Sequence, residues 1–474
     1  MIPLYFGYDI IPKYIHLLFG LLTSLLIFFY LKKRLDSAWG IVGGIFFLST
    51  PIVIKLCTTA YVDLGLVFFS TASLLSFLKW IKTDFQKKYL FLSAVMCGLA
   101  MGTKYNGLIT FSLLTLFVPF IFSRYNHPRR LGILVSIRYG LLFLFTSLVV
   151  FSPWMIRDFI WTGNPIYPLY DKWFNPSGYM SGASFGIFTY RSLVYNENWF
   201  QILILPLRVF FQGRDGVPQF FDGKLNPFLL ILPIFAFYHL KYDNERIRIE
   251  KKILLSFSAL YFVFALFSSH LRVRYISPII PPLVILSVFG LKRLLTFPNE
   301  SSSSQTKLVG VLLVTGSILS ALSLNTAYLI DQFTHVKPFT YISGKVSRIE
   351  YIKKHRPEYS AMEFINNNLP SDAKILFIFM GNRGYYCDRS YLFDMVYHKS
   401  RFENIVKGAR DFHEILQGLK TEGITHLLIN VKVFNKWAYQ SFKGPEREKV
   451  KKFFAKCLRH IYSKNGYSVF EVLK

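Results

Sequence analysis

Long apolar runs separated by short basic connections dominate the chain before residue 331. A helix that crosses a bilayer needs about 20 mostly apolar residues, and fewer when two helices are paired in a short hairpin. The fourth and fifth runs are short, so they form two hairpin helices, one long helix or a re-entrant pair. We predict membrane-spanning helices at roughly 12–31, 38–57, 62–81, 89–103, 106–123, 131–152, 225–241, 252–269, 275–294 and 307–330.

Lysine and arginine are concentrated in every second connection between these runs, for example at Lys32–Arg34 and Lys79–Lys88. If every predicted span crosses, all these basic connections lie on one side, which the positive-inside rule identifies as the cytoplasm. The chain is therefore expected in the cytoplasmic (inner) membrane as a multi-pass protein. The outer side then receives the segments Thr58–Tyr61, Lys104–Asn106, a long loop 153–224, His270–Tyr275 and everything after about 331.

The composition supports a polytopic α-helical membrane protein. Of the 474 residues, 52% are hydrophobic, 18% aromatic and only 17% charged, whereas a soluble domain carries about 25% charged residues. These figures exclude a disordered chain, a coiled coil and a small disulfide-rich scaffold. Much of the net charge of +28 lies in short loops between apolar runs, where basic residues set the membrane topology and contact anionic lipid headgroups. We therefore expect membrane lipids as partners and no nucleic acid. The four cysteines lack the spacing of a zinc site or a disulfide framework.

The pattern changes after residue 331, where the apolar runs shorten and charged residues become frequent. We therefore divide the chain into a transmembrane domain, 1–330, and a C-terminal extracytoplasmic α/β domain, 331–474. Its predicted helices are 359–369, 403–420 and 445–460, and its predicted strands are 374–379, 425–431 and 467–473.

Ionisable residues near the hydrocarbon region are costly, so each is a candidate for function. Asp63, in Thr58-Thr-Ala-Tyr-Val-Asp63-Leu, falls in the first turn of a span at the outer side. It is a functional carboxylate, a charge that complements the helix dipole, or a partner of Lys55. Lys104 lies at the tip of a predicted outer hairpin, next to Tyr105. It acts with a carboxylate on the same face, or it reaches the lipid headgroups.

The segment His270-Leu-Arg272-Val-Arg274-Tyr275 is the third candidate. If it is extended, Arg272 and Arg274 point to the same side, and two guanidinium groups suit a phosphate or phosphodiester. Contact with lipid headgroups is the alternative, and His270 is more often a hydrogen-bonded polar group than a base. Arg157 and Asp158 form either a simple surface pair or part of a sugar site, since the aromatic residues beside them suit both a sugar ring and the membrane interface.

No Walker loop, Rossmann glycine pattern, zinc-protease motif or nucleophile elbow is evident in the sequence. The carboxylate, lysine and arginines on one face instead suit transfer of a group from a lipid phosphate. A transporter or flippase of lipid-linked or small polar substrates is the alternative, although it should show polar residues at mid-bilayer and related halves. A non-catalytic membrane scaffold is the third interpretation.

A set of short motifs, in this order, resembles bacterial relatives of the protein O-mannosyltransferases, which are GT-C-fold glycosyltransferases. The same superfamily includes the aminoarabinose and galacturonosyl transferases that act on lipid A. The resemblance covers about 12–330, and the tail resembles their extracytoplasmic α/β domain. The motifs include Ser49-Thr50-Pro51, Thr59-Ala-Tyr-Val-Asp63-Leu, Gly98-Leu-Ala-Met-Gly102-Thr-Lys104-Tyr105, Pro153-Trp154-Met-Ile-Arg157, Gly163-Asn-Pro165 and Arg274-Tyr275-Ile-Ser-Pro278.

The resemblance implies a sugar donor carried on polyprenyl phosphate and used on the outer face, with a lipid, glycan or protein as acceptor. Basic side chains would stabilise the leaving phosphate, and a carboxylate would accept the proton of the acceptor hydroxyl. It leaves a divalent metal open as a cofactor. Asp63 is the expected catalytic residue, and the expected substrate or lipid-phosphate contacts are Lys104, Tyr105, Arg157, His270, Arg272 and Arg274.

The sequence departs from this family at its start. Family members begin with a further transmembrane helix and a long first outer loop that carries the principal catalytic Asp, whereas Asp9 lies too close to the first span to match it. We expect that the start codon is set too far downstream; a fragment or an inactive relative are the alternatives.

Overall fold

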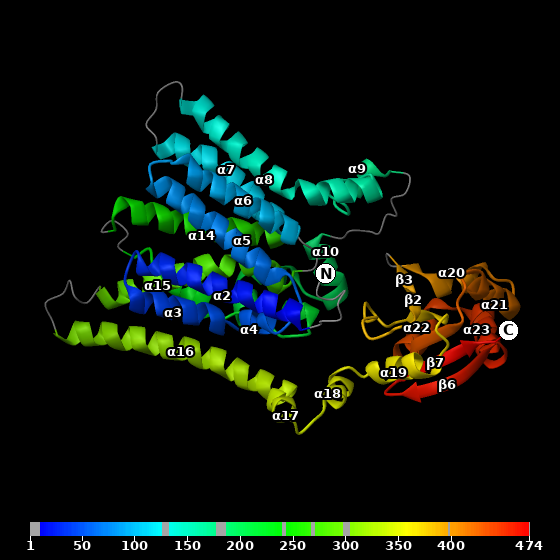
Figure 1. The fold of residues 1–474 in the computed structure, drawn as a ribbon. Coiled ribbons are helices and arrows are strands. Elements are labelled where there is room, and N and C mark those ends of the chain that lie inside the picture. Colours follow the sequence, from blue (N-terminus) through cyan, green and yellow to red (C-terminus); the bar gives the residue numbers. More distant parts are fainter. Residues whose placement is uncertain are drawn as a thin grey trace. The chain divides into compact units, whose positions relative to one another are not determined.

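The computed structural model describes residues 10–125, 132–176, 186–238, 243–266, 271–296, 304–396 and 399–473. The chain divides into two compact units, Met1–Thr334 and His335–Lys474. The first is a bundle of helices and the second contains a sheet (Figure 1).

All ten predicted spans contain helices. Among the described residues, six helices are long and apolar enough to cross a membrane, or seven if the bent pair α3–α4 is one span. Of the other predicted spans, α6 and α13 are shorter, with 17 and 8 residues, and α14 begins with several charged residues. The bundle helices are α2 (Ile11–Lys32), α3 (Ser37–Ser49), α4 (Pro51–Cys57), α5 (Asp63–Lys82), α6 (Lys87–Thr103), α7 (Gly107–Tyr125), α8 (Gly132–Thr162), α13 (Phe228–Phe235), α14 (Glu245–Leu266), α15 (Ile280–Thr296) and α16 (Ser304–Val336).

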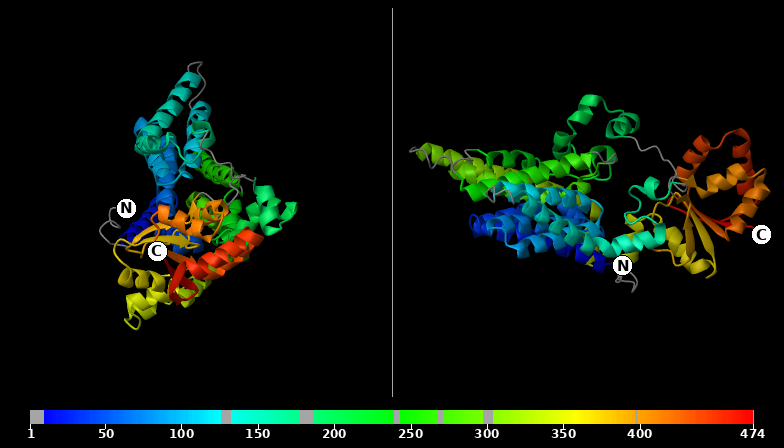
Figure 2. Two further views of the ribbon diagram at one scale, coloured as in Figure 1. Left: turned by 90° about the vertical axis from the view of Figure 1, so that its right-hand side faces the viewer. Right: turned by 90° about the horizontal axis from the view of Figure 1, so that it is seen from above.

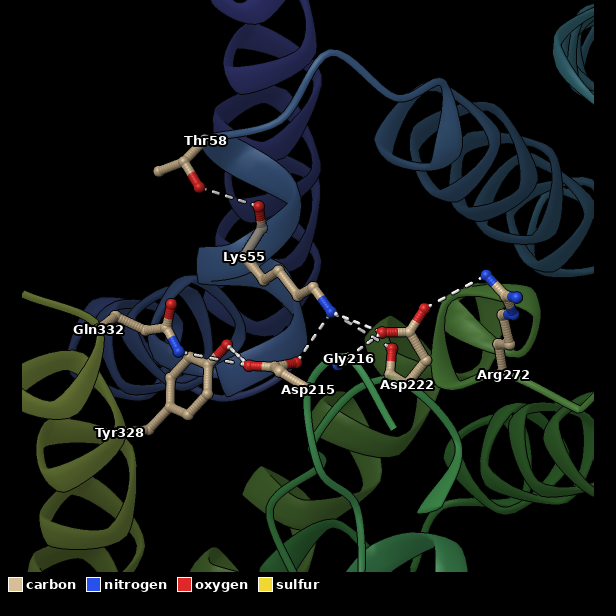
Figure 3. Close-up of polar contacts among 8 residues, drawn as sticks. All are labelled: Lys55, Thr58, Asp215, Gly216, Asp222, Arg272, Tyr328 and Gln332. Atoms are coloured by element: carbon tan, nitrogen blue, oxygen red, sulfur yellow. Dashed lines mark hydrogen bonds and ion pairs between the residues drawn. The ribbon is translucent and has the colours of Figure 1, made fainter. Parts of the chain in front are cut away.

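The segment predicted as one helix over 38–57 is broken. The axes of α3 and α4 differ by 68°, because Pro51 has no backbone N–H to donate and disfavours a helical conformation at the residue before it. Thr50 accordingly leaves the helical region, with φ −58° and ψ 129°. The break turns Lys55 of α4 toward the loop that precedes α13 (Figure 3).

Helices α6 and α8 pack closely against each other, and the edges of the bundle are apolar. A Cβ atom at Gly98 would lie 2.5 Å from Val150 and 2.6 Å from the Ser147 carbonyl oxygen, so only glycine lets α6 and α8 approach this closely. Helices α8 and α16 lie at opposite edges of the bundle (Figures 1 and 2) and expose apolar side chains such as Val149 and Leu312. Such faces are expected to contact lipid.

The predicted outer loop 153–224 is mostly helical. Helix α8 continues through Pro153 to Thr162, and four short helices follow. A buried ion network links the second of these helices to the fourth. Arg191 donates to both oxygens of Glu197, at 2.6 and 2.9 Å, and Arg208 donates to one of them at 2.9 Å. Burial opposes ionisation of Glu197, but the two guanidinium groups hold the pKa of this carboxyl below its ordinary value. The short helices are α9 (Asp171–Phe174), α10 (Ile187–Tyr195), α11 (Trp199–Leu203) and α12 (Leu205–Phe211), with a 3-10 turn η1 (Pro218–Phe220).

The second unit has an α/β fold around a five-stranded sheet with the order β2-β1-β5-β7-β6. Strands β2 and β5 lie on either side of β1 and run parallel to it, and β7 runs antiparallel to β5 and β6. Alternate residues of β1 enter two separate cores, one on each face of the sheet. The strands are β1 (Lys374–Ile378), β2 (Ser390–Phe393), β5 (His426–Asn430), β6 (Leu458–Lys464) and β7 (Tyr467–Val472); the helices are α19 (Tyr359–Asn368), α20 (Arg401–Gly408), α21 (Phe412–Thr421), α22 (Val431–Ser441) and α23 (Gly444–Lys456).

Two predicted elements of this unit differ from the structure. The helix over 403–420 is interrupted, because the Asp411 side chain accepts hydrogen bonds from the His413 and Glu414 amides and starts α21 as a new helix. The helix over 445–460 ends at Lys456, and the chain continues directly as strand β6, where Leu458 pairs with Val472.

Candidate functional site

The structure brings Asp63 and Lys104 together. Asp63 is the first residue of α5 and only 1% exposed, and its Oδ1 accepts a hydrogen bond from Lys104 Nζ at 2.6 Å. Lys104 follows the last residue of α6, and its side chain is 21% exposed. A buried carboxylate needs such a partner, because an unpaired charge inside a protein is costly.

Aromatic rings connect this ion pair to Arg274. The Lys104 ammonium lies 4.4 Å from the centre of the Tyr275 ring. The Arg274 guanidinium lies 4.6 Å from the Tyr61 ring and 5.3 Å from the Tyr275 ring, and it interacts electrostatically with Asp63. The Arg274 Nε is buried and finds no hydrogen-bond acceptor among the described residues. Two cations and an unused donor therefore lie beside one carboxylate.

Arg272 and Arg274 have different partners. The segment is not extended: Val273–Tyr275 is a 3-10 turn, in which the Tyr275 amide donates to the Arg272 carbonyl at 2.9 Å. Residues two apart in such a turn do not share a face. Arg272 instead donates to Asp222 Oδ2 at 3.2 Å, so the expectation that both guanidinium groups point to one side is wrong. His270 lies outside the described residues.

Figure 3 shows a second ion cluster, centred on Lys55. Lys55 Nζ lies 2.9 Å from Asp215 Oδ1 and 3.1 Å from Asp222 Oδ1, so Lys55 does not pair with Asp63 as one interpretation suggested. Tyr328 of α16 donates to Asp215 Oδ2 at 2.6 Å. Burial opposes ionisation of Asp222, but the Gly216 amide, Lys55 and Arg272 outweigh it and keep the pKa of Asp222 below its ordinary value.

Tyr105 and Arg157 meet at a third carboxylate. Tyr105 Oη lies 2.9 Å from Asp158 Oδ2 and 2.6 Å from the Tyr167 carbonyl oxygen. Arg157 donates from Nε and Nη2 to Asp158 Oδ1 at 2.9 and 2.7 Å, and it lies over the Trp161 ring. Burial, with the Asp158 carboxylate as the next cause, raises the pKa of Tyr105 to about 12, so its hydroxyl is neutral at physiological pH.

His16 is a site residue to which the sequence analysis assigned no role. Its Nε2 accepts a hydrogen bond from the Leu64 amide at 2.8 Å, so the ring proton is on Nδ1, which lies 2.7 Å from the Leu56 carbonyl and 3.0 Å from the Thr59 carbonyl. One neutral imidazole therefore fixes the turn between α4 and α5 that presents Asp63. A histidine inside an apolar span is the signal that could have indicated it.

The residues of these clusters lie at one end of the bundle, where α4 ends, α5 begins and the short helices after α8 gather (Figure 1). The cations at this end can bind an anionic group, and a carboxylate there can accept a proton. Within the part of the chain that the structure describes, no group of three or more His, Cys, Asp or Glu residues is placed to hold a metal ion.

Comparison with known proteins gives one family and several related structures. The family model of dolichyl-phosphate-mannose-protein mannosyltransferases matches residues 13–156, a range that includes His16, Asp63, Lys104 and Tyr105. No curated protein matches the chain.

Two kinds of solved protein share the fold. ArnT from Cupriavidus metallidurans, solved both alone and bound to undecaprenyl phosphate, is 13% identical with a TM-score of 0.52, covering 97% of this chain and 83% of ArnT. The oligosaccharyltransferase AglB from Archaeoglobus fulgidus, in complex with an inhibitory peptide and a dolichol-phosphate, is 9% identical with a TM-score of 0.52, covering 93% of this chain and 61% of AglB. The chain therefore has the GT-C fold, as the resemblance implied, and is a multi-pass membrane protein.

Proposed function

We propose that this chain moves a sugar from a polyprenyl-phosphate donor to an acceptor at the outer face of the cytoplasmic membrane. The observation that carries the proposal is the buried Asp63–Lys104 ion pair beside Arg274 at one end of an apolar bundle. The match to a dolichyl-phosphate-mannose family supports it, as do related structures that hold undecaprenyl phosphate and dolichol-phosphate.

The leaving group of such a donor is an anionic phosphate, which gains charge as the bond to the sugar breaks. Lys104 and Arg274 are the proposed contacts, because fixed cations in a site of low dielectric stabilise developing negative charge. The free Nε of Arg274 is a donor that a phosphate oxygen would satisfy. Arg272, held by Asp222, is the proposed third cation.

The acceptor oxygen forms a bond to the anomeric carbon while the bond between that carbon and the phosphate oxygen breaks. The acceptor proton passes to Asp63, the proposed general base. Because Asp63 is buried under Lys104, we propose that the donor phosphate draws the Lys104 ammonium away and so exposes the carboxylate. Tyr105 and Arg157, fixed at Asp158, would line the neighbouring wall for the sugar or the acceptor.

The test is sugar transfer by the purified full chain in lipid nanodiscs, with radiolabelled polyprenyl-phosphate sugars as donors. Asp63→Asn and Lys104→Met should lower turnover by about 10²–10⁴-fold, the range of a lost general base or charge-stabilising group. Asp84→Asn is the matched control, because Asp84 is an exposed carboxylate just beyond the far end of α5. Turnover by Asp63→Asn equal to that of the control would remove Asp63 from the reaction.

The same purified chain, reconstituted in proteoliposomes, distinguishes a transporter. If the labelled lipid-linked sugar crosses the bilayer of proteoliposomes without transfer to any acceptor, and Asp63→Asn leaves that movement unchanged, the enzyme assignment is wrong.

A further inference from the structure

Two helices of the C-terminal unit enclose an apolar pocket that the proposed transfer chemistry does not use. The pocket lies between α22 and α23, next to the end of β5 and Phe470 of β7, and has a volume of about 390 Å³. Small-molecule sites in proteins measure about 300–1,000 Å³. The apolar side chains that line it include Ile429, Phe434, Ala438, Phe442, Val450 and Phe454.

The same pocket is lined by two cations, Arg447 and Lys451. Arg447 donates from Nη2 to the carbonyls of Tyr439 and Phe442, at 2.8 and 3.0 Å, and lies over the Tyr439 ring, so its guanidinium is fixed. Its Nε is buried and has no acceptor among the described residues. A buried donor without an acceptor costs free energy, which an oxygen of a ligand would recover.

The charge of these helices favours an anion. Residues 431–456 carry many more basic than acidic side chains, and such a local excess attracts anions. The basic residues are Lys432, Lys436, Lys443, Arg447, Lys449, Lys451, Lys452 and Lys456, against Glu446 and Glu448.

We propose that this pocket binds an anionic amphiphile with one hydrocarbon chain. The chain lies among the aromatic and aliphatic side chains, and a carboxylate or phosphate head accepts hydrogen bonds from Arg447 and Lys451. A small ligand is favoured over a protein segment, because a stable protein interface buries about 800 Å² on each partner, whereas this pocket is of small-molecule size. The proposal is independent of the sugar-transfer reaction.

The experiment uses the full chain in phosphatidylcholine nanodiscs with a palmitate that carries a photoactivatable diazirine. After irradiation, mass spectrometry should find crosslinks concentrated on peptides of α22 and α23. Dodecyl phosphate should compete and dodecanol should not, because only the phosphate has a charged head. If lysophosphatidylglycerol, an anionic membrane lipid with one hydrocarbon chain, competes from the nanodiscs too, the natural source is a membrane lipid; if it does not, the source is a free amphiphile.

Three variants test the contacts. Arg447→Gln should weaken labelling about ten-fold, the effect of losing a charge-assisted hydrogen bond, and Ala438→Phe should block the pocket. Lys451→Gln, at an exposed position where folding is not at risk, should also weaken labelling. Lys436→Gln is the control, an exposed lysine of α22 that does not line the pocket. Labelling without enrichment on α22 and α23, or unchanged by Lys451→Gln and Ala438→Phe, would overturn the proposal.

Discussion

Tyr275 places one aromatic ring beside both cations of the candidate site. The Lys104 ammonium and the Arg274 guanidinium both lie within cation–π distance of this ring. Their mutual repulsion is offset by the ring and by Asp63, which accepts from Lys104 and attracts Arg274. The ring thus fixes the spacing of the charges that a phosphate would meet.

We predict that Tyr275→Leu raises the KM for the lipid-linked donor about two- to thirty-fold, the range of a cation–π interaction of about 0.5–2 kcal/mol. Tyr275→Phe, which keeps the ring and loses only the hydroxyl that interacts with Arg274, should raise the KM less than Tyr275→Leu does. Steady-state kinetics with varied donor measures the difference. Equal KM values for the Leu and Phe variants would show that the ring does not hold the cations.

His426 provides a residue-scale prediction for the C-terminal unit. It lies in β5 opposite Glu471 of β7, and burial lowers its pKa although Glu471 partly opposes the shift. The unfolded chain, with an ordinary pKa of about 6.5, therefore binds more protons than the folded unit below that pH. The free energy of unfolding of the unit should have its full value above about pH 6.5 and should fall as the pH decreases through the folded-state pKa.

Hydrogen exchange of the β1 and β5 amides in the full chain, corrected for intrinsic rates, measures this loss. His426→Gln should flatten the pH dependence, whereas His460→Gln, at an exposed position of β6, should not. If the pH dependence of exchange persists in His426→Gln, another titratable group causes it.

At the scale of elements, the apolar runs predicted where the bundle helices lie, because burial in lipid requires continuous hydrophobicity, but they did not predict that the run 38–57 is the two helices α3 and α4. The turn at Val273–Tyr275 was not predicted, because two arginines spaced two apart, Arg272 and Arg274, fit a strand as well as a 3-10 turn. Strand β6, LRHIYSK, has too little alternation to be recognised and is defined by its pairing with β7. The Lys55–Asp215 pair joins residues 160 positions apart, and no local sequence pattern can predict such a pair.

The loop 213–224 depends on such distant contacts, and Asp222 is their centre. It accepts from Lys55 and Arg272, and the Gly216 amide donates to it at 2.9 Å. Asp222→Asn should remove the two ionic contacts but keep the Gly216 hydrogen bond, so the loop should open more often. Trypsin should then cleave after Arg214 about ten-fold faster, since cleavage follows the population of the open form. Peptide mapping of timed digests measures the rate, and a rate equal to that of Asp84→Asn would contradict the prediction.

For the whole molecule, the distribution of charge gives the orientation. Lys32, Lys82, Arg124 and Arg246 lie at or near helix termini at the end of the bundle away from the candidate site. At the site end, Lys55 and Lys104 are instead engaged in ion pairs. By the positive-inside rule the site end should face away from the cytoplasm, where a donor carried on a polyprenyl phosphate would be used.

Reporter fusions test this orientation. A phosphatase that folds only outside the cytoplasm should be active when fused after Lys345, which follows α16, and inactive when fused after Asp84, in the connection between α5 and α6. The two positions differ by an odd number of crossings if each predicted span from 89–103 to 307–330 crosses the membrane, including α6, α13 and α14, which are short or charged. Activity at both positions would show that one of these helices is re-entrant. Activity at Asp84 alone would place the Asp63–Lys104 pair on the cytoplasmic side. The pair could then not act on a donor at the outer face, and the proposed function would be wrong.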